Sequence, residues 1–185
     1  IVIIMGDRYE ILAPVAAAIP FNIPIVHIYG GAVTLGAIDE LIRHGVTKIS
    51  HLHLTAHHQY SNRLVKMGEE KWRIKTVGIP EITNLKKQKN ISIDNLKKEI
   101  FLDLRIKTLL VTLHPTTINF KNIDKEIDNL LKALKKSKFQ IIFTYPNSDL
   151  GHKKIIKKIK VFCQKKQQYV FIKNASISLY ANLLK

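Results

Sequence analysis

The chain has 185 residues, a formal net charge of +16 and a hydrophobic fraction of 46%. That composition excludes a wholly disordered chain and is typical of a globular protein with one ordinary core or two small ones. The apolar runs are far shorter than the roughly 20 residues of a membrane-spanning helix, so we expect neither a membrane segment nor a signal peptide.

Most of the positive charge comes from lysines in the second half of the chain. These lysines occupy the polar positions of amphipathic patterns without interleaved aromatic residues, which favours a solvated surface over a nucleic-acid interface. An acidic ligand such as a nucleotide diphosphate is also compatible with this charge. The single cysteine, Cys163, cannot form an internal disulfide, and we therefore expect a cytoplasmic protein.

Strand and helix patterns alternate through the first half. An isoleucine-rich run at residues 1–5 predicts a strand covered on both faces, as in a parallel sheet. The turn GDR follows it, and residues 9–19 then carry a helical apolar stripe. Pro14 predicts that this helix starts late or is bent.

A second strand, at residues 23–28, reaches the pair Gly30-Gly31, where a sharp backbone turn requires residues without a Cβ. An amphipathic helix over about 36–50 follows this turn. The pattern then repeats as a strand, a helix and a strand at residues 51–55, 57–67 and 73–77. Such alternation predicts right-handed βαβ crossovers and a parallel sheet, which binds ligands at the carboxyl ends of its strands.

Four histidines within eight positions raise the alternative of a metal site: His51, His53, His57 and His58. The first two alternate along the predicted strand, no cysteine or carboxylate lies beside the group, and neither an HExxH nor a CxxC spacing is present. Histidines that are exposed or hydrogen-bonded within the protein are the favoured interpretation, and we expect no metal.

The regular pattern weakens between residues 80 and 107, where the chain is polar and lysine-rich and a helix is expected to start at Ser92 or Asp94. This stretch is the expected domain boundary. In the second half, strands are predicted at 108–113, 140–145 and 169–172, with helices over about 121–136, up to 164 and over 176–185. The polar turns LHPTT and YPNSD follow two of these strands, so a cleft between two α/β domains would gather them with GDR and HIYGG.

The segments GDRYEIL, HIYGG, TLGAIDELIRHGVTKISHLHLT, VGIP, VTLHPTT and YPNSD, in this order and spacing, resemble the hydrolysing UDP-N-acetylglucosamine 2-epimerases of sialic-acid-type sugar synthesis. The resemblance covers nearly the whole chain. It implies an α/β fold of two Rossmann-like parallel-sheet domains in the glycosyltransferase-B arrangement, both incomplete here. Residues 1–85 would be the later part of the N-terminal domain, 86–106 a linker region, and 107–185 the earlier part of the C-terminal UDP-binding domain.

The resemblance also implies a reaction. The enzyme would remove a proton at C2 of the sugar, expel UDP by elimination and add water to the resulting glycal. UDP-N-acetylglucosamine, or a diacetamido relative, would thereby become UDP and an N-acetylmannosamine-type sugar. No cofactor is implied, neither a metal ion nor a nicotinamide. The partner would be a UDP-sugar, with no nucleic acid and no membrane, and a homo-oligomer of the full-length protein is an open alternative.

Site residues follow from the resemblance motif by motif. Proton transfer is assigned to a catalytic group made of Asp7 of GDR, Asp39 and Glu40 of the IDE segment, and His44. Contacts to UDP or the sugar are assigned to Arg8, His27, Gly30, Gly31, Arg43, His114 of LHPTT and Asn147 of YPNSD.

The chain departs from the family pattern at one turn. The family places a glutamate in HIxGGE, or two positions after the histidine, and this chain has Ala32 and Tyr29 there. Tyrosine, with an ordinary pKa near 10, is a poor base at neutral pH. Besides an active epimerase, two alternatives therefore remain: a catalytically impaired fragment or nucleotide-sugar-binding remnant of the family, and a basic nucleic-acid binder.

Overall fold

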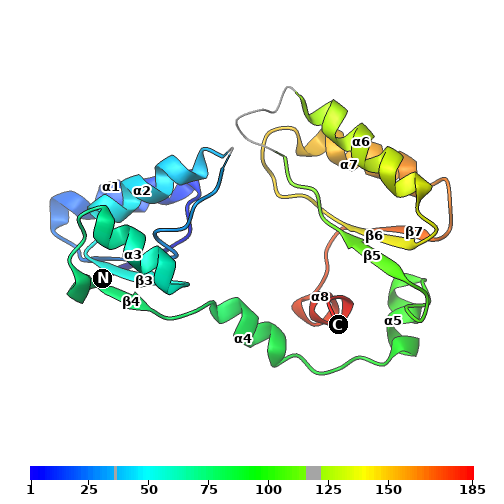
Figure 1. Ribbon diagram of the computed structural model, residues 1–185, viewed down its shortest axis with the longest axis horizontal. Helices are drawn as coiled ribbons and strands as arrows, with labels where there is room; N and C mark the ends of the chain where they lie inside the picture. Colours follow the sequence, from blue (N-terminus) through cyan, green and yellow to red (C-terminus); the bar gives the residue numbers. More distant parts are fainter. Residues whose placement is uncertain (36, 116–121) are drawn as a thin grey trace. The chain divides into compact units, whose positions relative to one another are not determined.

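The computed structural model describes residues 1–35, 37–115 and 122–185. The described chain forms two compact units, Ile1–Glu81 and Ile82–Lys185. Each unit is an α/β structure around its own parallel sheet, which confirms the fold class predicted from the sequence (Figure 1). Within the described ranges, no helix combines the length and apolar character needed to cross a bilayer.

Four parallel strands make the first sheet, in the order β1-β2-β3-β4. They are β1 (Val2–Met5), β2 (Ile25–Ile28), β3 (Leu52–Thr55) and β4 (Ile74–Thr76). The connections contain the helices α1 (Leu12–Ala18), α2 (Asp39–Ile49) and α3 (His58–Lys66), the 3-10 turns η1 (Tyr9–Ile11), η2 (Ile19–Phe21) and η3 (Lys71–Arg73), and α4 (Pro80–Lys86) after the last strand. The helix expected from about residue 36 is therefore α2, and Gly36 itself lies outside the described residues.

The expectation that β1 is covered on both faces was wrong. Ile4 is buried against Val15 and Val46, which come from α1 and α2. Its neighbours Ile3 and Met5 point to the opposite face and are 68% and 56% exposed. The reason is that successive residues of a strand alternate between faces, and in this unit the described helices pack on one face only.

Pro14 fits because the helix begins late. Residues 9–11 form the 3-10 turn η1, and α1 starts at Leu12, which puts Pro14 in the first helical turn. The backbone nitrogens of that turn have no partner inside the helix, so the missing N–H of proline costs no hydrogen bond there.

The second sheet is covered on both faces. Its strands β5 (Thr108–Val111), β6 (Gln140–Thr144) and β7 (Tyr169–Ile172) are parallel and pair in that order. Helices α6 (Ile123–Lys136) and α7 (His152–Cys163) pack on one side of the sheet, while α5 (Ile93–Ile100) and α8 (Ile177–Leu183) pack on the other (Figure 1).

The buried residues of β6 divide between the two layers of helices. Phe143 contributes to the cluster under α6 and α7, and Ile142 contributes to the cluster with Leu96 of α5 and Leu179 of α8. The stretch expected as a linker, 86–106, thus contains a helix that adds Leu96 to the core of the second unit. Ser92 caps this helix by accepting a hydrogen bond from the backbone N–H three residues on, as expected.

Candidate active site

The carboxyl ends of the first sheet bring together segments that are far apart in the sequence. Because all four strands are parallel, the turn after β1, the turn after β2 and the segment after β4 leave the sheet at the same edge. These segments contain Asp7, Tyr29 and Glu81 respectively. The sequence predicted polar groups at this edge from the first two turns, and the third segment was not part of that prediction.

Arg43 ties two of these loops together. Its side chain, on α2, is 2% exposed and donates hydrogen bonds from Nε to Asp7 Oδ2 at 3.0 Å and from Nη2 to the same oxygen. It also donates from Nη1 to the carbonyl of Ala32 at 2.8 Å and from Nη2 to Thr34 Oγ1 at 2.7 Å. The guanidinium is therefore engaged by the protein itself and fixes the position of the Asp7 carboxylate.

The first turn of α2 carries the other acidic residues predicted for the site. Asp39 and Glu40 begin the helix, and Glu40 Oε2 accepts a hydrogen bond from the N–H of Thr34 at 3.2 Å. Glu40 Oε1 lies 3.5 Å from His44 Nε2, one helical turn later. His44 Nδ1 is buried and has no hydrogen-bond partner among the described residues. Glu40 and His44, both assigned to the catalytic group, are thus brought together on one face of α2.

His27, on β2, connects the turn after β1 to helix α2. Its side chain has no exposed surface, and Nε2 donates to the carbonyl of Gly6 at 2.8 Å while Nδ1 lies 3.3 Å from Thr47 Oγ1. Burial lowers the pKa of His27, and the hydrogen bond to Gly6 opposes this only in part. A neutral imidazole accepts at Nδ1 from the Thr47 hydroxyl. His27 therefore contacts the turn before Asp7 and α2, and offers no surface to a ligand.

The second turn excludes a Cβ at Gly31 and leaves little room for one at Gly30. A Cβ on Gly30 would lie 3.1 Å from His27 Nδ1, and a Cβ on Gly31 would lie 2.5 Å from the carbonyl oxygen of Tyr60. Gly31 also has a φ of +79°, in the left-handed region that side chains disfavour. The sequence prediction that this turn excludes a Cβ is confirmed.

Tyr29 meets a carboxylate that the sequence did not predict. Its hydroxyl donates a hydrogen bond to Glu81 Oε2 across 52 positions of sequence. Partial burial, together with the hydrogen bond to Glu81, raises the pKa of Tyr29 to about 12. The phenol is therefore a proton-bearing donor at neutral pH. No local sequence signal could have found this contact, because Glu81 lies beyond two further strands.

Arg8, assigned to the nucleotide, lies beside the same edge. Its Nε is 3.5 Å from Glu10 Oε2, and its guanidinium lies over the ring of Tyr9 at 5.6 Å. Its side chain is 35% exposed, in contrast to that of Arg43.

The four clustered histidines have structural contacts. His53 Nε2 lies 3.3 Å from Glu69 Oε2, His51 Nδ1 accepts from the N–H of Ile25, and His57 Nδ1 caps α3. The ring of His58 lies 3.9 Å from that of His57. In the described ranges no group of three or more histidine, cysteine or acidic side chains is arranged to hold a metal ion.

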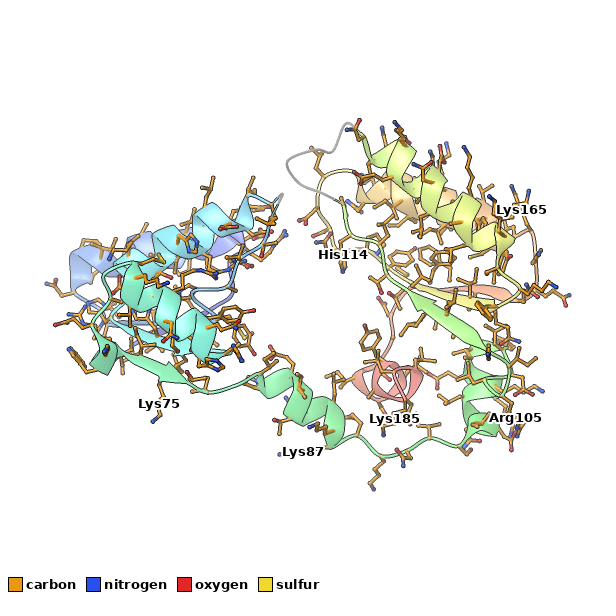
Figure 2. The ribbon with its side chains drawn as sticks, viewed as in Figure 1. Lys75, Lys87, Arg105, His114, Lys165 and Lys185 are labelled. Atoms are coloured by element: carbon orange, nitrogen blue, oxygen red, sulfur yellow. The ribbon has the colours of Figure 1, made fainter. Side chains whose placement is uncertain are left out.

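The second unit brings His114 and Asn147 together. These residues follow β5 and β6, which are neighbours in the sheet, and His114 Nδ1 accepts a hydrogen bond from the N–H of Asn147 at 3.0 Å (Figure 2). The Asn147 side chain donates from Nδ2 to Asp149 Oδ2 at 2.6 Å. With Nδ1 as acceptor, a neutral His114 carries its hydrogen on Nε2, a donor suited to an anionic oxygen. The two threonines that complete LHPTT, Thr116 and Thr117, lie outside the described residues.

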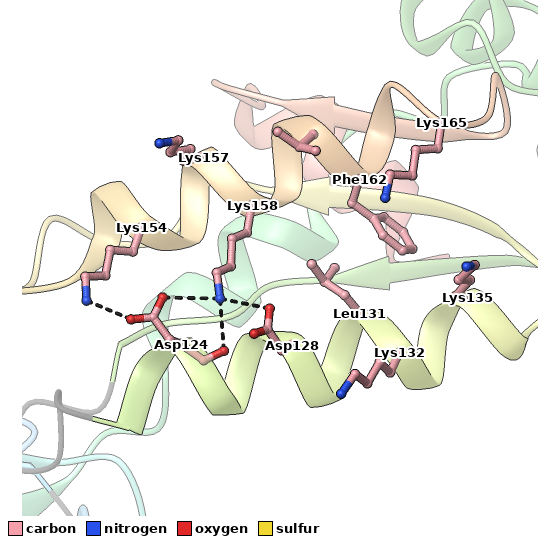
Figure 3. A pocket seen from close by; sticks show the side chains of 11 residues that line it. Asp124, Asp128, Leu131, Lys132, Lys135, Lys154, Lys157, Lys158, Phe162 and Lys165 are labelled. Atoms are coloured by element: carbon pink, nitrogen blue, oxygen red, sulfur yellow. Dashed lines mark hydrogen bonds and ion pairs between the residues drawn. The ribbon is translucent and has the colours of Figure 1, made fainter.

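A separate groove runs between α6 and α7. It encloses about 550 Å³ and has six lysines and two aspartates along it (Figure 3). Lys154 and Lys158 bind Asp124, and Lys158 also binds Asp128, so part of the positive charge is neutralised within the groove. None of the residues predicted for the site lines it. The groove is not the site that the motifs indicate.

Comparison with known proteins identifies relatives along the whole chain. The family model described as UDP-N-acetylglucosamine 2-epimerase matches residues 1–185. The GDP/UDP-N,N'-diacetylbacillosamine 2-epimerase (hydrolyzing) of Campylobacter jejuni is 38% identical over 100% of this chain and 48% of its own length. The polysialic acid biosynthesis protein P7 of Escherichia coli is 36% identical over 88% of this chain and 42% of its own length.

Solved structures agree on the fold. The UDP-GlcNAc 2-epimerase from Neisseria meningitidis bound to UDP-GlcNAc matches with a TM-score of 0.77 at 18% identity, over 98% of this chain and 51% of that one. This likeness supports the two Rossmann-like parallel-sheet units. The chain thus spans about half the length of the relatives it matches.

Proposed function

The chain belongs to the UDP-N-acetylglucosamine 2-epimerase family, and on this premise we propose that the whole protein is a hydrolysing 2-epimerase. It acts on a UDP-linked N-acetylated amino sugar and releases UDP and the free sugar epimerised at C2. The observation that carries the proposal is the match at 38% identity along the entire chain to a relative named as a hydrolysing 2-epimerase. UDP-N-acetylglucosamine and UDP-N,N'-diacetylbacillosamine are the two substrates that the relatives' names suggest.

In this proposal the first unit supplies the proton transfers. Asp7, Asp39, Glu40 and His44 form the acid and base groups, because carboxylates and imidazole exchange protons near neutral pH. Support comes from the placement of Asp7 at a strand end and from the contact between Glu40 and His44. Asp7 and the pair of Glu40 with His44 lie at the carboxyl ends of the strands, where open parallel sheets bind their ligands.

The groups assigned to the nucleotide are described for each unit by itself. Arg8 and the backbone at Gly30 and Gly31 serve in the first unit, and His114 and Asn147 serve in the second. A hydrogen-bond donor such as His114 Nε2–H stabilises a diphosphate oxygen while the C1–O bond breaks. Arg43 and His27 act indirectly, since their polar atoms already bind Asp7 and Gly6. No step in this scheme calls for a metal ion or a nicotinamide.

We also propose that the protein works in the cytoplasm. Within this chain the single cysteine, Cys163, is half-buried and free, so no disulfide formed inside it calls for an oxidising compartment. A UDP-sugar is the proposed partner, without nucleic acid or membrane, and a homo-oligomer of the full-length protein is part of the proposal.

Turnover by the full-length protein tests the proposal. Purified protein is incubated in D2O with each of the two UDP-sugars, UDP is quantified by chromatography, and the sugar is followed by NMR. We expect UDP and a C2-epimerised free sugar with deuterium at C2, because the proton returned to C2 comes from solvent. UDP-glucose, which lacks the acetamido group, is the control. Nucleotide binding without any UDP release would instead support the nucleotide-sugar-binding remnant, and the enzymatic proposal would fail.

A further inference from the structure

The contact between Tyr29 and Glu81 joins the ends of two strands that are not neighbours. Tyr29 follows β2, Glu81 is the second residue of α4 after β4, and β3 lies between these strands in the sheet. Both residues leave the sheet at its carboxyl edge, the edge that also carries Asp7. The carboxylate of Glu81 is therefore held at the same edge as the acid predicted from the sequence.

Tyr29 is the residue that makes this contact possible. Its φ is 72°, in the left-handed region that non-glycine residues rarely adopt. A residue held there is found where the surrounding structure enforces it, and such residues cluster at functional sites.

Glu81 differs from Asp7 and Glu40 in its partner. Asp7 is held by the guanidinium of Arg43, and Glu40 lies beside His44. Glu81 accepts a hydrogen bond from a neutral hydroxyl and, within the described part of the chain, forms no ion pair. A cation next to a carboxylate favours the ionised form and so lowers the affinity of the carboxylate for a proton. A neutral hydrogen-bond donor orients the carboxylate and lowers its proton affinity less.

We propose that Glu81 is the base that takes the C2 proton of the sugar, with Tyr29 as the residue that positions its carboxylate. The inference rests on the proposed function. The C2–H bond breaks and its proton goes to a Glu81 oxygen, while the electron pair of that bond forms the C1=C2 double bond of the glycal. The C1–O bond to UDP breaks with its electron pair on the diphosphate oxygen. Glu81 then passes its proton to water.

The test compares Glu81→Gln and Tyr29→Phe with the wild type in the full-length protein. For Glu81→Gln we expect kcat for UDP release to fall by about 100-fold or more with KM nearly unchanged, the typical size of a lost general base. The primary isotope effect with substrate deuterated at C2 should grow, because proton removal becomes rate-limiting. Glu70→Gln is the matched control, since Glu70 is exposed, pairs with Arg73 and precedes β4 at the opposite edge of the sheet.

Tyr29→Phe separates a positioning role from a merely structural one. Loss of the hydrogen bond that orients the Glu81 carboxylate should lower kcat by about 10-fold with KM nearly unchanged. The primary isotope effect with substrate deuterated at C2 should grow, because proton removal becomes slower. These two measurements also decide the matter should Glu81→Gln fail to fold.

The two proposals fail in different ways. A wild-type protein that releases no UDP from either sugar overturns the proposed function. A wild type that turns over, with kcat of Glu81→Gln within about 3-fold of the wild-type value or with kcat and isotope effect unchanged in Tyr29→Phe, overturns the role of Glu81 alone.

Discussion

Arg43 and Asp7 form a largely buried ion pair although 36 positions separate them in the sequence. Arg43 is 2% exposed and Asp7 is 29% exposed, so the guanidinium lies under the edge of the sheet and the carboxylate reaches its surface. The same guanidinium binds the carbonyl of Ala32 and the hydroxyl of Thr34. Arg43 thus holds the turn after β1 and the loop after β2 in one arrangement.

Replacing Arg43 by methionine should destabilise the protein. Loss of the cation leaves the Asp7 carboxylate and two loop oxygens without their donor, and breaking such a buried pair costs about 3 kcal/mol. The free energy of unfolding from urea titration of the full-length protein is the measurement. Arg8→Met is the control, because the side chains of Arg8 and Glu10 are 35% and 55% exposed and their more solvated ion pair should contribute less than the pair of Arg43 with Asp7. Equal decreases in the free energy of unfolding of the two variants would contradict the proposed role of Arg43 in holding the two loops.

Two glycines should respond to alanine with opposite signs. Gly31→Ala should lower the free energy of unfolding by about 2 kcal/mol or more, since its φ is +79° and its Cβ would lie 2.5 Å from a backbone oxygen. Gly45→Ala, inside α2 with nothing within 4 Å of the added Cβ, should raise it by about 0.5–1 kcal/mol. Thermal or urea unfolding of the two variants measures these changes. A Gly31→Ala variant that is more stable than the wild type would show that the turn does not exclude a Cβ at position 31.

Stability should fall as the pH drops below about 6.5. Burial lowers the pKa of both His27 and His53 from the ordinary value of 6.5, so these groups stay neutral in the folded protein while the unfolded chain binds protons. The contribution of the two neutral histidines to the free energy of unfolding is complete above pH 6.5. It is lost as the pH falls from 6.5 toward the folded-state pKa values.

Glu69 adds to this loss at lower pH. Although burial acts in the opposite direction, the hydrogen bond from Lys48, the charge of Lys48 and the hydrogen bond from His53 lower the pKa of Glu69 below 4.5. Urea titrations from pH 8 to 4 measure how the free energy of unfolding changes with pH.

His27→Gln should make this pH dependence weaker below pH 6.5, whereas His58→Gln, at an exposed position, should leave the slope unchanged. A slope that His27→Gln leaves intact would refute the assignment.

A glutamate at position 32 should compensate for loss of the carboxylate at 81. The family pattern HIxGGE has a glutamate at the position of Ala32, and the carbonyl of Ala32 is held by a hydrogen bond from Arg43. In the full-length protein, Ala32→Glu added to Glu81→Gln should restore UDP release by about 10-fold over Glu81→Gln alone. Ala32→Gln in the same background is the control, because it has the shape without the charge. Equal activity of the two double variants would argue against a role for a carboxylate.

His114→Ala should weaken nucleotide binding. Removal of the Nε2–H donor, and of the acceptor for the N–H of Asn147, should raise the Kd for UDP by about 10-fold, or about 1.4 kcal/mol. Calorimetry on the full-length protein measures this, and the free energy of unfolding should change little because His114 is exposed. Asn129→Ala, on the exposed face of α6, is the control. An unchanged Kd in His114→Ala would remove this residue from the nucleotide site.

The sequence by itself determined all seven strands of the described residues and most of their helices, although α4 was not expected, and it proposed the candidate site residues. Apolar runs and helical stripes are local patterns, so they predicted β1, β6 and α6 without knowledge of the fold. Parallel strands end at a common edge, and this rule predicted that the turns with His114 and Asn147 follow strands at one edge, where the structure shows the two residues in contact.

Only the tertiary structure decided which side chains meet across elements. The hydrogen bond from Tyr29 to Glu81 depends on the course of the chain after β4, and the partners of Arg43 depend on how α2 packs against two loops. The exposure of Ile3 depends on which face of the first sheet the helices cover. Periodicity reports the conformation of neighbouring residues, whereas these contacts are set by register and packing between segments that are distant in the sequence.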